Sequence, residues 1–84
     1  MKPAELIVQD VLSREGYHAA RHGYSILVYD DKIEAFIHVH NMYRLITVKL
    51  YRFGDRSSQE RIVRLVEEAL PGYRVEVGEA PPCS

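Results

Sequence analysis

Residues 33–51, IEAFIHVHNMYRLITVKLY, alternate apolar with other side chains at a period of two, which indicates β-strands that each bury one face. In the first strand the odd positions are apolar, and after residue 43 the buried positions become the even ones. A two-residue turn at residues 41–42 pairs residue 37 with 46 and residue 35 with 48, so that buried positions face one another. The other face of the first strand then carries Glu34, Phe36, His38 and His40. The segment predicts an antiparallel hairpin.

Two further hairpins before residue 33 obey the same parity. A turn at Asp30–Asp31 pairs Val28 with Ile33, and a turn at His22–Gly23 pairs Ala19 with Ile26. Three hairpins with matching parity predict an antiparallel meander of three or four strands. Neither Asp-Asp nor Asn-Met is a favoured two-residue turn, so loops that are longer by one or two residues remain an alternative.

Helical patterns flank the meander on both sides. Pro3 suits a first helical position, and Gly16 suits the left-handed residue that ends a helix. The buried stripe of this first helix is predicted at Ala4, Ile7, Val8, Val11 and Leu12. Ser57 with Glu60 three residues later predicts a capping box at the start of a second helix, which Pro71–Gly72 ends. Its buried stripe is predicted at Ile62, Leu65, Val66 and Ala69.

A last short strand follows the second helix, because Tyr73, Val75 and Val77 alternate with charged residues. The predicted order is one helix, three or four strands, a second helix and one strand. This order predicts an α+β fold, a two-layer sandwich in which both helices pack on one face of an antiparallel meander sheet. We expect one domain over residues 1–78 and a flexible tail at residues 79–84.

The composition excludes several classes of function. Eleven basic and twelve acidic residues among 84 give a net charge of −1, so there is no general attraction to nucleic acid. The single cysteine, Cys83, cannot form an internal disulfide, which favours a reducing, cytoplasmic location. The sequence shows no signal peptide or membrane span, and it contains no glycine-rich phosphate loop or other cofactor motif. We therefore expect no cofactor and no membrane.

The sheet face turned away from the helices is the most informative predicted surface. A solvated sheet face is normally polar, yet this one carries adjacent apolar and aromatic residues around a single predicted pair, Glu34 opposite Lys49. Contiguous apolar patches usually mark interfaces, although single exposed apolar residues are common. The predicted interaction face comprises Leu27, Tyr29, Phe36, His38, Tyr43, Leu45 and Tyr51.

Three histidines converge on one end of this predicted face. The turn at His22 would lie beside His38, and His40 follows two residues along the same strand. Three neutral imidazoles are a ligand set for zinc or copper. However, residues two apart on a strand are separated by about 7 Å, and no carboxylate or thiolate completes the set. Solvated or interfacial histidines are therefore preferred over a metal site, and a pH-sensitive interface is an intermediate alternative.

Catalytic groups have simpler explanations. Asp30 and Asp31 fall in a predicted turn, the hydroxyls of Ser57 and Ser58 fall at a helix start, and Cys83 lies in the predicted tail. Nothing in the sequence places a nucleophile beside a base, so we do not predict an enzyme.

The predicted order of one helix, three strands and a second helix also occurs in double-stranded-RNA-binding domains, which makes nucleic-acid binding an alternative. The lysine cluster that those domains carry at the second helix is absent from GDRSSQERIVR. Residues 15–25, EGYHAARHGYS, resemble HicA-type RNA-cleaving toxins in the positions of Gly16, Tyr17, Arg21, Gly23 and Ser25. The resemblance implies RNA cleavage, but Ile26 stands where those toxins have their catalytic histidine.

The sequence therefore predicts a small intracellular protein-interaction domain that self-associates through its open sheet face. The alternative is a nucleic-acid-binding domain, double-stranded-RNA-binding-like or toxin-like, or a metal-binding domain that uses the same face. The expected partner is a second copy or another protein, and nucleic acid is not the preferred partner.

Overall fold

The computed structural model describes residues 2–79 and confirms the α+β fold class. The chain forms, in order, α1 (Ala4–Arg14), β1 (His18–His22), β2 (Ser25–Tyr29), β3 (Ile33–His40), a 3₁₀ turn (Asn41–Tyr43), β4 (Leu45–Leu50), α2 (Arg56–Ala69) and β5 (Arg74–Glu79). The meander thus has four strands. Of the predicted tail, residues 80–84 lie outside the described residues, and Glu79 is the last residue of β5.

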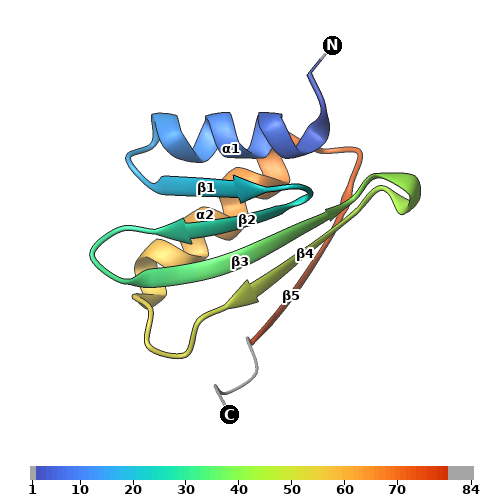
Figure 1. The fold of residues 1–84 in the computed structure, drawn as a ribbon. Helices are drawn as coiled ribbons and strands as arrows, with labels where there is room; N and C mark the ends of the chain where they lie inside the picture. Colours follow the sequence, from blue (N-terminus) through green and yellow to red (C-terminus); the bar gives the residue numbers. More distant parts are fainter. Residues whose placement is uncertain (1, 80–84) are drawn as a thin grey trace.

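All five strands join one sheet in the order β1-β2-β3-β4-β5. The first four run antiparallel, whereas β5 pairs parallel with β4 because α2 returns the chain to the same end of the sheet. Both helices pack on one side of this sheet and touch one another, so the opposite side carries no helix (Figure 1). We call this opposite side the outer face.

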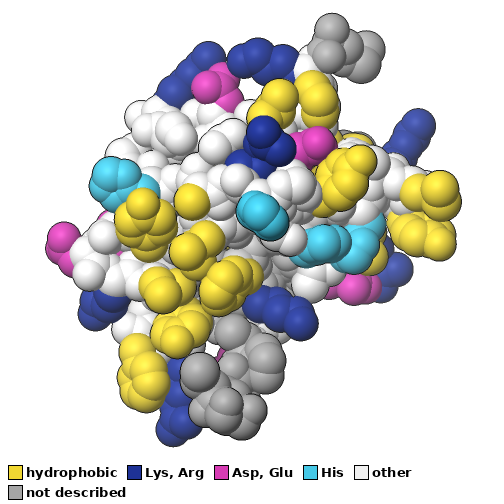
Figure 2. All heavy atoms as spheres, viewed as in Figure 1, with side chains coloured by type: hydrophobic (Ala, Val, Ile, Leu, Met, Phe, Trp, Pro, Cys, Tyr) yellow, Lys and Arg dark blue, Asp and Glu magenta, His cyan; other side chains and the backbone are white. Residues whose placement is uncertain are grey.

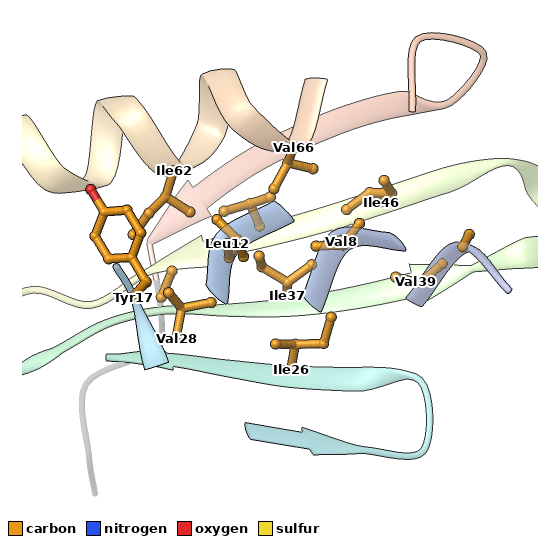
Figure 3. Close-up of a cluster of buried hydrophobic side chains, with 13 residues drawn as sticks. Val8, Leu12, Tyr17, Ile26, Val28, Ile37, Val39, Ile46, Ile62 and Val66 are labelled. Carbon is orange, nitrogen blue, oxygen red and sulfur yellow. The ribbon is translucent and has the colours of Figure 1, made fainter. Parts of the chain in front are cut away.

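The core lies between the helices and the inner side of the sheet (Figure 3). Val8 and Leu12 of α1 and Ile62 and Val66 of α2 are buried against the strands. The strands contribute Ile26, Val28, Ala35, Ile37, Val39, Ile46 and Val48, all of them buried. Since these residues alternate along β2, β3 and β4, the period-two pattern of the sequence correctly identified most of the inner positions.

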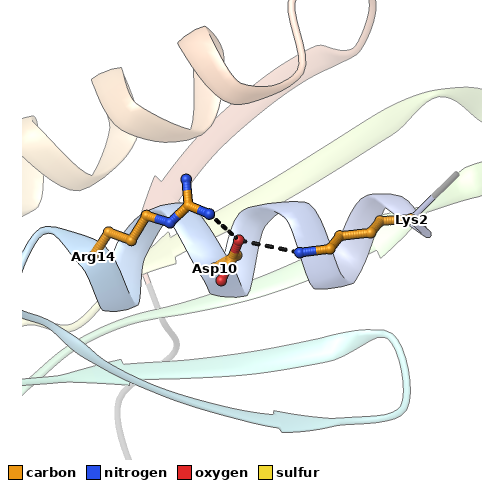
Figure 4. A network of polar contacts seen from close by, with 3 residues as sticks. All are labelled: Lys2, Asp10 and Arg14. Atoms are coloured by element: carbon orange, nitrogen blue, oxygen red, sulfur yellow. Dashed lines mark hydrogen bonds and ion pairs between the residues drawn. The ribbon is translucent and has the colours of Figure 1, made fainter.

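The exposed side of α1 carries a small charge network. The carboxylate of Asp10 forms ion pairs with Lys2 at 3.3 Å and with Arg14 at 3.0 Å (Figure 4). All three side chains are well exposed, so each pair contributes at most about 1 kcal/mol. The helix ends at Arg14, and Gly16 adopts the left-handed conformation (φ +94°) that was predicted from its position.

The predicted capping box of α2 is wrong. The helix begins at Arg56, and its N-cap is Asp55, whose carboxylate accepts a hydrogen bond of 2.9 Å from the backbone N–H of Ser58. Ser57 therefore lies inside the first turn. An aspartate is as good an N-cap as a serine, and here the chain geometry after Gly54 selects the earlier residue.

In all three hairpins the observed strand register is shifted by two residues from the register predicted with two-residue turns. Ile37 pairs with Val48, Val28 with Ala35, and Ala19 with Val28. A shift of two preserves parity, so buried residues still face buried residues. The β3–β4 connection spans residues 41–44 and ends with Arg44 in the left-handed conformation (φ +50°). The longer-loop alternative is thus correct at this turn.

The predicted pairing of Glu34 with Lys49 on the outer face is wrong. An irregularity between Val28 and Tyr29 lets Tyr29 pair with Ile33, while Val28 pairs with Ala35. Glu34 is the extra residue of this β-bulge, and its side chain is fully buried. Ile33 consequently shares the outer face with Tyr29 instead of joining the core. The outer partner of Lys49 is Phe36.

Candidate functional site: the outer face of the sheet

Cross-strand pairing orders the outer face into rows that run across the strands. One row contains Ala20, Leu27, Phe36, Lys49 and Gly78, and the next contains His22, Ser25, His38, Thr47 and Glu76. His18, Tyr29 and Ile33 lie beyond the first of these rows, and His40, Leu45 and Arg74 lie beyond the second. All four histidines of the chain therefore lie on this one face.

Apolar side chains gather at the Tyr29 end of the outer face (Figure 2, lower left). We call Leu27, Tyr29, Ile33, Phe36 and Tyr51 the apolar patch. Leu27 and Phe36 are direct cross-strand partners, and the ring of Phe36 lies 6.4 Å from that of Tyr51 in a tilted arrangement. Phe36 remains 42% exposed although it occupies the central strand β3. The patch thus holds large apolar groups in contact with one another and with solvent.

The predicted interaction face does not form one continuous surface. Leu27, Tyr29, Phe36 and Tyr51 belong to the apolar patch. Leu45 pairs with His40 near the opposite end of the sheet, separated from the patch by the row of His38. Tyr43 lies in the 3₁₀ turn beyond β3 and is 75% exposed. The predicted face therefore divides into an apolar end and a polar end.

Hydroxyl groups hold the two imidazoles at the polar end. The Nδ1 atom of His38 lies 2.8 Å from the Ser25 hydroxyl, and the Nε2 atom of His40 lies 3.3 Å from the Thr47 hydroxyl. The centroids of the two rings are 4.4 Å apart. Each ring therefore has one nitrogen bonded to a hydroxyl group, and its other nitrogen has no hydrogen-bond partner among residues 2–79.

A shallow, open depression of about 350 Å³ lies over these groups. We call its lining the histidine depression: Ser25, Phe36, Ile37, His38, His40, Thr47 and Lys49. Lys49 forms no ion pair with any residue of 2–79, and the nearest acid in the rows, Glu76, is bound to Arg74 at 3.2 Å. The depression thus contains an uncompensated cation beside two imidazoles.

The three candidate metal ligands are not brought together. His38 and His40 are adjacent, but His22 is separated from β3 by the whole of β2, where Ser25 lies between it and His38. Within residues 2–79 no group of three histidine, cysteine or acidic side chains is placed to hold a metal ion. The fourth histidine, His18, stacks on the ring of Tyr29 with centroids 5.0 Å apart.

Glu34 is the most unusual ionisable group of the described chain. One carboxylate oxygen accepts a hydrogen bond of 2.7 Å from the N–H of Asp55, and the other has no N–H or O–H donor among residues 2–79. Burial raises the pKa of Glu34, and the nearby charges of Asp30 and Asp55 raise it further. Burial alone would also raise the pKa of Asp30, but hydrogen bonds from the Lys32 N–H and from Glu34 lower it instead. Burial and the neighbouring Asp30 carboxylate therefore both favour the protonated form of Glu34.

Glu34 also fixes the loop before α2. The side chain of Gln59 donates hydrogen bonds to the carbonyl oxygens of Glu34, at 3.0 Å, and Tyr51, at 2.7 Å. Gly54 packs so closely over Gln59 and Glu34 that a Cβ atom at this position would collide with both. This arrangement joins the bulge of β3 to the start of α2, and its role is structural.

The candidate catalytic residues remain dispersed. Asp30 and Asp31 lie in the β2–β3 turn, as predicted, and Ser57 and Ser58 lie in the first turn of α2. Cys83 falls outside the described residues. Two hydroxyl groups lie within hydrogen-bond reach of an imidazole, Ser25 beside His38 and Thr47 beside His40. Sequence spacing did not single out these pairs because they meet only through strand pairing.

A larger depression, of about 550 Å³, lies between residues 50–56 and the end of β5. It is lined by two cations, Arg52 and Arg56, and by two acids, Glu60 and Glu79. Since its charges balance, it does not favour an ion of either sign.

Comparison with models of protein families, with curated proteins and with solved structures finds no match to this chain. No helix within residues 2–79 is long and apolar enough to cross a membrane. The function is therefore inferred from the chemistry of the outer face.

Proposed function

We propose that this chain is a protein-interaction domain that self-associates through the apolar patch of its outer face. The observation that supports the proposal most is the partly exposed Phe36 on the central strand, in contact with Tyr51 and paired with Leu27. Covering three large apolar side chains of this kind stabilises an assembly by roughly 5 kcal/mol. That is comparable to the entire folding stability expected of a small domain.

A second copy of the chain is the occupant that the composition of the patch favours. The molecule measures 34 × 26 × 21 Å and the patch occupies one end of its broad side, so an interface there leaves the histidine depression uncovered. A two-fold axis through the patch would place Phe36 of each copy near Phe36 of the other, as in isologous dimers. Lys49 lies at the margin of the patch, where charged residues of an interface remain hydrated.

The size of the core supports the same conclusion. The described residues bury one small core between the helices and the sheet, and oligomerisation is a common way to stabilise such domains. Every copy carries the same patch, so self-association covers it without requiring another protein. Tyrosine and phenylalanine are also enriched in the cores of interfaces.

The test is the solution mass, measured by light scattering, of the native protein and of Phe36→Glu. We expect twice the 9.7 kDa chain mass for the native protein and the chain mass for the variant, which buries a charge in the interface. Met42→Glu is the matched control, since Met42 is highly exposed and lies outside the patch. Leu27→Lys is a second variant within the patch. A native monomer, or a Phe36→Glu dimer, would refute the proposal.

A further inference from the structure

We propose that the histidine depression binds the oxyanion of a small phosphorylated ligand. This inference does not depend on self-association, because the groups that carry it lie at the polar end of the outer face. Phe36 is the one residue that belongs to both the apolar patch and the depression.

The first support is the identity of the groups that converge there. Lys49 supplies a permanent positive charge, and His38 and His40 supply imidazoles whose free nitrogens are available to a ligand. The hydroxyls of Ser25 and Thr47 add neutral donors beside them. Charge-assisted hydrogen bonds to such groups are the usual means by which proteins hold phosphate and sulfate.

The second support is that the carboxylate beside the depression already has a partner. Within residues 2–79, Lys49 has no ion-pair partner, whereas Glu76, in the same row as His38 and Thr47, pairs with Arg74 at 3.2 Å. The other titratable groups facing this part of the sheet are His18 and His22 of β1, Tyr24 before β2, Tyr29 of β2 and Tyr43 of the 3₁₀ turn. Glu76 is the one carboxylate among these groups, and its pairing with Arg74 offsets its repulsion of a bound anion.

The protonation state of each histidine determines whether the neighbouring hydroxyl group can donate a hydrogen bond to a ligand. When His38 is neutral, its Nδ1 atom can accept a hydrogen bond from the Ser25 hydroxyl group. When His38 carries both protons, Nδ1–H must donate to the Ser25 oxygen, and the hydroxyl proton becomes available to a ligand. His40 and Thr47 are related in the same way through Nε2. Protonation therefore adds positive charge and also frees two hydroxyl donors.

A small ligand is favoured over a nucleic acid. A nucleic-acid backbone is bound by a row of cations, whereas Lys49 is the only lysine or arginine that lines the depression. The chain as a whole has a net charge of −1, which would oppose a polyanion. The donors of the depression are one lysine, two imidazoles and two hydroxyl groups, which suffice to bind a single oxyanion group.

Sulfate titration of the ¹⁵N-labelled native protein, followed by NMR at constant ionic strength, tests the inference. Sulfate keeps its two negative charges throughout the range in which imidazoles titrate, so any pH dependence arises from the protein. We expect saturable shifts at the amides of His38, His40, Thr47 and Lys49, with a dissociation constant on the order of millimolar. Binding should weaken about fivefold or more between about pH 6 and about pH 8.

Variants separate a defined site from general surface charge. Lys49→Ala should weaken sulfate binding about fivefold or more at either pH, whereas Arg64→Ala, which removes an exposed cation on α2, should leave it unchanged. The double variant His38→Gln, His40→Gln should lose the pH dependence. Shifts that do not saturate, an equal loss in Arg64→Ala, or equal binding at both pH values would overturn the inference. A short oligoribonucleotide that binds more than about tenfold tighter than sulfate would overturn the assignment to a small ligand.

Discussion

The buried carboxylate of Glu34 accepts a hydrogen bond of 2.7 Å from the backbone N–H of Asp55, the residue that caps α2. This bond connects the bulge of β3 with the start of α2 across 21 positions of the chain. Because the bulge sends Glu34 inward, Ile33 takes a place on the outer face beside Tyr29. The contact therefore helps to determine the composition of the apolar patch.

The first prediction concerns the ionisation of Glu34. Its raised pKa means that the native state binds a proton more tightly than the unfolded chain, in which the pKa is near its ordinary value of 4.5. Above that pH the unfolded chain has lost the proton of Glu34 while the native state still holds it. The free energy of unfolding therefore falls as the pH rises, until Glu34 is ionised in the native state as well. Glu34→Gln should remove this dependence.

Glu34→Gln should also raise the free energy of unfolding at neutral pH by about 1 kcal/mol. The glutamine oxygen can still accept from the Asp55 N–H, and its amide group can donate to Asp30. Urea titrations across a pH series measure both effects, with Glu67→Gln on the exposed side of α2 as the control. A less stable Glu34→Gln at neutral pH would show that the carboxylate charge itself is required.

The second prediction compares two candidate caps of α2. Asp55→Ala should lower the free energy of unfolding by about 1 kcal/mol, because the Ser58 N–H loses its acceptor. Ser57→Ala should change it by less than about 0.5 kcal/mol, since Ser57 is exposed and is not the cap. Equilibrium denaturation of the two variants distinguishes the observed cap from the capping box. A larger effect for Ser57→Ala would contradict the structure.

The third prediction concerns the close packing at Gly54. A Cβ atom there would lie within 2.5 Å of Glu34 Oε1 and closer still to Gln59 Nε2. Gly54→Ala should therefore lower the free energy of unfolding by about 1–3 kcal/mol, the range for an overpacked site. Gly72→Ala is the control, because its Cβ would meet no atom within 4 Å. Equal melting temperatures for the two variants would argue against this contact.

The inner face of the sheet was largely predictable because it follows from alternation alone. Ile37 and Val39 of β3 and Ile46 and Val48 of β4 are buried as expected, although each hairpin is shifted by two residues. A two-residue shift leaves every side chain on its own face, so parity carries no information about it.

The bulge was not predictable from the same pattern. Residues 33–39 alternate without interruption, and nothing in that run indicates that Glu34 is buried. The Glu34 carboxylate accepts a hydrogen bond from the Asp55 N–H, and its carbonyl oxygen accepts one from the Gln59 side chain. Both donors are distant from Glu34 in the sequence. The pairing of Ser25 with His38 depends on this non-local geometry, whereas the pairing of Lys49 with Phe36 follows from the length of the β3–β4 connection. The separation of the apolar patch from the histidine depression was missed for the same reason.

The last prediction concerns metal ions, and it follows from the strand order. His22 and His38 belong to strands that lie on either side of β2, so their backbones are separated by about 9–10 Å across two strand spacings. Two nitrogen ligands of one zinc ion lie only about 3–4 Å apart, given bonds of about 2 Å. Within residues 2–79 no third ligand joins His38 and His40, whose ring centroids are 4.4 Å apart, and two imidazoles on an open surface form a weak site. We expect the melting temperature of the native protein to be the same with and without a chelator, and His22→Ala to leave zinc binding unchanged. One equivalent of tightly bound zinc, lost in His22→Ala, would require a rearrangement of β1 and would contradict the observed register.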